Sequence, residues 1–136
     1  MKLILRGVFA GIPLKFQTTR PEDAICSEFA YKLREMQLSG EVKKDFAWTH
    51  VANESNGKVS YQAEMAEKAL GKVAGWPDHM FVWSTGSFGI EFKTPKGVQS
   101  PKQKAVQAWF DKCGIPYYIC RSSKEAFVAL KSQGLI

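Results

Sequence analysis

The sequence predicts a mixed α/β domain built around one central sheet. Two observations lead to this prediction. Segments with apolar residues at helical spacing alternate along the chain with short, strongly apolar segments of strand length. The 136 residues are 45% hydrophobic and 24% charged, an ordinary globular composition at a length that suits one domain. We therefore expect neither intrinsic disorder, nor a repeat architecture, nor a membrane-spanning helix.

The first predicted helix begins at Pro21. Ile25, Phe29 and Leu33 recur at helical spacing, and Gly40 ends the pattern. Alternation, turn residues and glycine stops then predict the remaining elements. In chain order these are a strand over 45–51, a turn over 53–58, a helix over 60–70, a loop over 73–77, strands over 79–83 and 88–94, a helix over 101–113, a strand over 116–120 and a last helix from Ser122.

The helix over 101–113 has the clearest boundaries. Ser100 is the expected N-cap, Pro101 occupies the first helical position, and Gln103 stands where a capping box places Glu or Gln. Gly114 stops the helix. A second capping box is predicted at the start of the last helix, between Ser122 and Glu125.

Residues 1–20 are predicted to form a strand or hairpin that precedes a single domain over 21–136. Arg6 interrupts the apolar N-terminal stretch and no small-residue cleavage pattern closes it, so we do not expect a signal peptide. Cys26, Cys113 and Cys120 have no zinc-ligand spacing and are predicted to be buried thiols of a reducing, cytoplasmic compartment.

Positive charge is concentrated in the last third of the chain. Residues 91–136 hold 8 basic and 3 acidic side chains, against 11 and 10 in residues 1–90. Such a surplus favours a polyanionic partner, nucleic acid first. We expect Lys96, Lys102 and Lys104, together with Ser100 at the helix start, to follow a phosphate backbone.

The strand over 88–94 carries the most informative charges. Strand parity places Glu91 and Lys93 on one face and leaves Ile90 and Phe92 for the core. Asp78, at the start of the partner strand, can approach the same face. Two carboxylates and a lysine at one sheet edge suit Mg²⁺ and phosphoryl chemistry. The alternative is a hairpin with a surface salt bridge.

Several other residues allow more than one interpretation. Gln103 is explained either by the cap alone or by the cap together with a role in the site. His50 and His79 are expected in loops or in the core rather than as ligands. The four tryptophans are expected to pack the core, although Trp76, just before Asp78, is also placed to contact DNA bases.

Four blocks of sequence occur in an order that resembles a known family. They are Gly75-Trp76-Pro77-Asp78, then Ile90-Glu91-Phe92-Lys93-Thr94, then Ser100-Pro101-Lys102-Gln103, then Gly114 followed by Tyr118 and Arg121-Ser122. Together they resemble the virus-type replication-repair nuclease (VRR-NUC) family of the PD-(D/E)xK superfamily, over about Pro21 to Leu130. His50 to Glu54 also resembles the family's loop after the first strand, with Ala52 where proline is usual.

The resemblance implies a restriction-endonuclease-like fold with an αβββαβ core and assigns roles within it. Asp78 and Glu91 would bind Mg²⁺ or Mn²⁺ with the Phe92 carbonyl, Lys93 would be the catalytic lysine, and Gln103 would belong to the helical glutamine motif. A glutamate on the first helix would complete the site, with Glu22 the best fit and Glu28 the alternative. Trp76 and His79 depart from the family pattern, which bears on substrate preference.

The function implied is that of a metal-dependent endonuclease on branched DNA such as four-way junctions. Stand-alone family members are mainly phage or prophage proteins, and the family includes homodimers, so we expect a homodimer and no membrane partner. Two rival hypotheses remain. One is a DNA-binding module that keeps the fold but does not cut, and the other is a protein-interaction domain with incidental hairpin charges.

Overall fold

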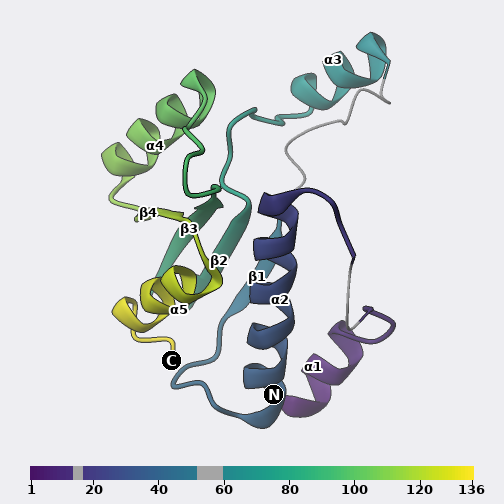
Figure 1. Ribbon diagram of the computed structural model, residues 1–136, viewed down its shortest axis with the longest axis vertical. Helices are drawn as coiled ribbons and strands as arrows, with labels where there is room; N and C mark the ends of the chain where they lie inside the picture. Colours follow the sequence, from purple (N-terminus) through teal and green to yellow (C-terminus); the bar gives the residue numbers. More distant parts are fainter. Residues whose placement is uncertain (14–16, 52–59) are drawn as a thin grey trace.

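The computed structural model describes residues 1–13, 17–51 and 60–136, and the predicted turn over 53–58 lies outside them. The prediction of a mixed α/β domain with one central sheet is confirmed (Figure 1). In chain order the elements are α1 (Lys2–Val8), α2 (Pro21–Ser39), β1 (Ala47–His50), α3 (Tyr61–Ala69), β2 (His79–Trp83), β3 (Gly86–Phe92), α4 (Pro101–Cys113), β4 (Tyr117–Cys120) and α5 (Ser123–Ser132).

The described sheet has four strands in the order β1-β2-β3-β4. β1 pairs antiparallel with β2, and β2 pairs antiparallel with β3 through a tight hairpin. β4 pairs parallel with β3, in a register that sets Glu91 opposite Ile119. A parallel neighbour needs a crossover connection, and α4 supplies it.

The two faces of the sheet bury different amounts of apolar surface. α2 and α5 pack on one face, where Phe29, Phe81 and Phe92 belong to the main core cluster. α4 packs on the other face over a smaller cluster, in which Val106 and Phe110 are buried. Figure 1 shows α4 apart from α2 and α5, and α3 projecting away from the sheet.

The helix boundaries follow the expected capping chemistry. α2 has Pro21 at its first turn and ends at Gly40, whose φ of 87° lies in the left-handed region that favours glycine. α4 has the full predicted capping box: the Ser100 hydroxyl accepts the Gln103 N–H, and the Gln103 side chain accepts the Ser100 N–H. No helix in the described ranges has the length and apolar character needed to cross a bilayer.

Three predictions, about one segment and two single residues, are wrong. Residues Lys2–Val8 form a helix rather than a strand, since Leu, Lys and Arg are good helix formers and Leu5 alone is buried there. Trp109 is half exposed, on the outer side of α4, rather than in the core. Cys113 is exposed rather than buried, whereas Cys120 is buried and Cys26 half-buried.

The strand parity gives the first testable prediction. Ile90 is fully buried at the centre of β3, so Ile90→Ala should lower the free energy of unfolding by about 2–4 kcal/mol. Val82→Ala on neighbouring β2, where the side chain is 49% exposed, should cost well under ~1 kcal/mol. Urea denaturation measures both. Equal midpoints for the two variants would contradict the assignment of faces.

Candidate active site

Five of the predicted site residues lie around one point, the end of β3 on the face toward α4. Glu91 and Lys93 come from this strand and the residue after it, and Asp78 comes from the segment just before β2. Gln103 comes from the first turn of α4 and Glu22 from the first turn of α2. Four separate stretches of chain therefore contribute to one group of polar side chains, the carboxylate cluster.

Glu91 is the centre of the cluster and is only 2% exposed. One carboxylate oxygen, Oε1, accepts hydrogen bonds from Lys93 Nζ at 2.9 Å and from Gln103 Nε2. The other, Oε2, is buried with no hydrogen-bond partner among the described residues. Burial, and next the charge of Asp78, raise the pKa of Glu91 to about 7.

Asp78 faces the same end of β3 from across the hairpin. Its Oδ2 accepts the Phe92 N–H at 2.6 Å, and its carbonyl oxygen accepts the Val51 N–H at 2.7 Å. Burial raises the pKa of Asp78, against the opposing effect of the hydrogen bond from Phe92. Asp78 is thereby fixed to both neighbouring strands.

Lys93 is the cation of the cluster. The side chain of this residue is 10% exposed and forms a buried ion pair with Glu91, so the surface salt bridge considered from the sequence is excluded. Burial disfavours its charge, but the hydrogen bond to Glu91 and the charges of Glu91, Glu22 and Asp78 prevail and raise its pKa. Lys93 is therefore protonated at neutral pH.

Gln103 belongs to the helix cap and also contacts the carboxylate cluster. Its Oε1 accepts the Ser100 N–H at 2.9 Å as a capping residue, while its Nε2 donates to Glu91. One planar amide thus joins the start of α4 to the buried carboxylate. The orientation of the amide is fixed at both ends, so Gln103 also fixes how Glu91 is oriented.

The structure distinguishes between the two candidate glutamates of α2. Glu22 Oε1 accepts the Thr94 N–H at 3.4 Å, and its charge contributes to raising the pKa of Asp78 and of Glu91. Glu28 is exposed and pairs instead with Lys32, one turn along the same helix. Glu22 is the residue brought to the cluster.

The donor set suits a hard divalent cation. Within the described ranges, no three His, Cys, Asp or Glu side chains form a group that could hold a metal unaided. Mg²⁺, however, is commonly held by one or two carboxylates and keeps several waters or phosphate oxygens. Asp78 and the unpartnered Oε2 of Glu91 offer oxygen ligands of this kind, and a cation would offset the repulsion between the two carboxylates. The Phe92 carbonyl is the further ligand that the family resemblance implies.

The residues predicted to bind DNA lie at the start of α4 and before it. Lys96, Lys102 and Lys104 are exposed and form no ion pair with the described part of the chain. Ser100 is also exposed, but its hydroxyl is used in the helix cap. The three lysines therefore remain available to a partner, whereas Ser100 has a structural role.

Arg121 is a residue whose role the sequence does not predict. Its Nη1 lies within hydrogen-bonding distance of three carbonyl oxygens, those of Thr94 at 2.5 Å, Gly97 at 2.8 Å and Pro95 at 3.2 Å. This guanidinium holds the turn that leads from Lys93 to α4. A lone arginine after a strand gives no sequence signal of such a contact.

Two glycines let the segment before Asp78 lie close to its neighbours. Gly75 has a φ of +89°, and a Cβ there would stand 2.6 Å from the Lys102 carbonyl carbon. A Cβ on Gly89 would stand 2.5 Å from Cγ of Pro77. The Trp76-Pro77-Asp78 segment is therefore packed directly against both α4 and β3. Gly75, two residues before Pro77, is the sequence signal from which this close packing could have been inferred.

The two histidines form a pair at the ends of β1 and β2. Their ring centroids are 5.1 Å apart. His79 is almost completely buried, and burial, then the charges of His50 and Arg34, lower its pKa to about 3. It is a neutral core residue, as the sequence predicts. His50 is exposed, and its positive form would lower the pKa of Asp78.

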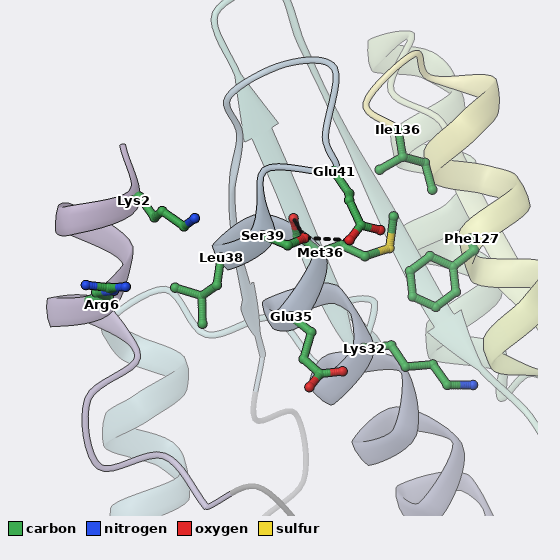
Figure 2. A pocket seen from close by; sticks show the side chains of 10 residues that line it. All are labelled: Lys2, Arg6, Lys32, Glu35, Met36, Leu38, Ser39, Glu41, Phe127 and Ile136. Carbon is green, nitrogen blue, oxygen red and sulfur yellow. Dashed lines mark hydrogen bonds between the residues drawn. The ribbon is translucent and has the colours of Figure 1, made fainter.

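A hollow of about 880 Å³ lies elsewhere, between α1, α2 and the C-terminus (Figure 2). Its lining mixes cations such as Lys2 and Arg6 with Glu35 and Glu41, and one hydrogen bond of 2.8 Å joins Ser39 to Glu41 across its wall. None of the residues of the carboxylate cluster lines it. The described residues that line the hollow do not bring a set of catalytic or metal-binding groups together.

Comparison with known proteins gives no relative for this chain: no family model matches it, and neither the curated proteins nor the solved structures contain a significant match. The chemistry of the carboxylate cluster is therefore inferred from its geometry and from the sequence motifs that form it.

The raised pKa of Glu91 predicts a pH-dependent cost in stability. Between the ordinary value of 4.5 and about 7, the folded state holds a proton that the unfolded state has released, so stability falls as pH rises through this window. Glu91→Gln resembles the protonated form. Without metal it should exceed wild type in unfolding free energy by roughly 1–3 kcal/mol at pH 8 and match it near pH 4.

Thermal melts in EDTA across this pH range measure the effect. Glu28→Gln, at an exposed position of α2, is the matched control and should track wild type throughout. A Glu91→Gln variant that is less stable than wild type at pH 8 would show that the ion pair with Lys93 outweighs the burial of the charge.

The contacts of Arg121 give a third prediction. Arg121→Ala removes the group that donates hydrogen bonds to three carbonyl oxygens. It should lower the free energy of unfolding by about 1–3 kcal/mol. Amide hydrogen exchange at Thr94 and Gly97 should rise by more than the loss of global stability accounts for. Arg121→Lys should restore only part of the protection, because an ammonium cannot reproduce the planar guanidinium. Lys124→Ala, on neighbouring α5, is the control; uniform exchange changes would contradict the local role.

Proposed function

We propose that this chain is a Mg²⁺- or Mn²⁺-dependent deoxyribonuclease of the PD-(D/E)xK type, similar to the VRR-NUC family, which acts as an endonuclease on branched DNA. One observation carries the proposal: a buried carboxylate with an unpartnered oxygen, Glu91, paired with Lys93 and close enough to Asp78 for the two charges to repel. A purely structural ion pair has no need of a second, half-buried carboxylate beside it.

The order of elements supports the same proposal. From α2 to β4 the chain runs helix, strand, strand, strand, helix, strand, apart from the projecting α3. This is the αβββαβ order that the family resemblance implies. The carboxylates lie at the end of β3, just before the crossover helix.

The residues divide the proposed reaction among them. Asp78, Glu91 and the Phe92 carbonyl would hold the cation, which when bound would polarise a phosphodiester oxygen and lower the pKa of a water. Lys93, protonated and fixed by Glu91, is positioned to stabilise negative charge developing on the phosphate. Gln103 holds Glu91 in one orientation, and Glu22 adds negative charge that favours cation binding.

The proposed preference for branched DNA rests on the resemblance and on the exposed lysines at the start of α4. One chain contributes one carboxylate cluster, so paired cuts in a four-way junction would require two copies. A two-fold homodimer is the commonest arrangement that supplies them.

A DNA-binding module that does not cut is the second candidate. It is favoured by the fact that Oε1 of Glu91 is already bonded to both Lys93 and Gln103, so a cation has to bind in competition with these contacts. The protein-interaction alternative has less support, because the charges of the hairpin are buried and convergent rather than displayed on the surface.

Labelled duplex, flap and four-way junction DNA, incubated with Mg²⁺ or EDTA, tests the proposal. We expect metal-dependent cleavage, and a loss of roughly 10²–10³-fold in rate for Lys93→Ala with DNA binding retained. Lys131→Ala, exposed on α5, should cut like wild type.

Salt-sensitive binding by wild type without any cleavage would favour the non-cutting module. Wild-type rates in a folded Lys93→Ala variant would contradict the assigned role of the lysine. Absence of DNA binding would contradict both DNA-related functions.

A further inference from the structure

The outer side of α4 presents a tryptophan to solvent. Trp109 is 51% exposed, although Val106 and Phe110 on the same helix are buried in the core beneath it. A large aromatic side chain in water is an unusual choice for a helix surface, and exposed aromatic residues are favoured where a protein binds a partner.

Neighbouring rings hold this side chain in place. The Trp109 ring lies 5.8 Å from the ring of Trp76 at an interplanar angle of 81°, and Trp76 in turn packs on Phe110 at 5.0 Å. Trp76 is part of the loop that leads to Asp78. Trp109 is therefore a supported platform, so little side-chain entropy is lost when a ligand stacks on it.

The charges around Trp109 indicate a polyanion. Lys102 and Lys112, at seven residues before and three after Trp109, share its helical face and form no ion pair with the described residues. Both are exposed, as is Ala105 between them, and no carboxylate occupies this stripe of α4. Glu64 of α3 is the acidic residue near enough for its pKa to be lowered by Lys102, after the larger effect of Lys68. A tryptophan between two unpaired lysines is the combination with which proteins bind exposed nucleobases and their phosphates.

The platform is continuous with the carboxylate cluster. Gln103, beside Lys102, donates to Glu91, and Gly75 is packed against the main chain of Lys102. Along the axis of α4, Trp109 lies about 10 Å from Lys102. That distance corresponds to the rise of roughly three base-stacked nucleotides, at about 3.4 Å each.

We infer that Trp109 stacks on an unpaired base of the DNA substrate, about three nucleotides from the phosphate bound beside Lys102. The inference rests on the proposed function and adds to it a substrate class, DNA with unpaired nucleotides near the site of cutting. Bases inside a duplex are already stacked on each other and do not offer a free face to the ring, so an intact duplex does not use this platform.

The experiment compares a duplex with the same duplex carrying a short single-stranded branch. The branch bears 2-aminopurine at one unpaired position at a time, and binding is measured with Ca²⁺ in place of Mg²⁺. Wild type should bind the branched DNA more tightly and quench 2-aminopurine most strongly near the third nucleotide. Trp109→Ala should lose roughly ten-fold or more in affinity for the branched DNA, and the quenching, with duplex affinity unchanged.

Two variants control for folding and for general loss of exposed aromatic surface. Trp109→Phe should retain most of the preference, because a flat ring remains. Tyr61→Ala removes an exposed aromatic side chain on α3 and should behave like wild type. Thermal melts verify that each variant is folded.

Each contrary outcome has one interpretation. If Trp109→Ala leaves the affinities for duplex and branched DNA unchanged, or lowers both equally, the inference is overturned and the proposed nuclease stands. A fall in the molecular mass of the DNA-free protein on Trp109→Ala, measured by light scattering, overturns it in favour of a self-association surface. A wild-type protein that binds no DNA overturns the proposed function as well.

Discussion

A buried carboxylate constrains the whole arrangement of this molecule around the end of β3. Glu91 is enclosed between the sheet and α4, where an ionised group without partners would be too costly to keep. Lys93 supplies a charge and Gln103 supplies a donor, and both have to reach the same oxygen. The start of α4, the end of β3 and the turn between them are positioned to satisfy that requirement.

The two apolar layers contribute unequally to holding this arrangement. The cluster under α2 and α5 is large and rich in aromatic rings, so that side of the sheet is rigid. Within the described ranges, the cluster under α4 has three buried members, Val106, Phe110 and Tyr117. With less apolar burial, the first turn of α4 depends on polar contacts: its capping box, the amide of Gln103 and the turn held by Arg121.

Local chemistry explains what could be predicted from the sequence. Alternation in β3 predicted which side chains enter the core, and the Ser100-Pro101 pair predicted where α4 begins, because both depend on neighbouring residues alone. The contacts of Glu22 with Thr94 and of Arg121 with the 94–97 turn join residues 72 and 24–27 positions apart. Such pairs become visible only when the fold is known. The N-terminal segment was mispredicted because its apolar residues suit a strand as well as a helix.

Arg121 binds the turn after Lys93 through three main-chain oxygens. Every residue type presents the same carbonyl group, so these three contacts do not depend on side-chain identity. Gly97 is constrained for a different reason, since a Cβ there would stand 2.9 Å from Thr94 Oγ1. Lys96 and Val98, both exposed there, are free to be exchanged without loosening the connection between the strand and the helix. The exposed positions of the turn can thus vary over evolutionary time while the carboxylate cluster beside it keeps its geometry.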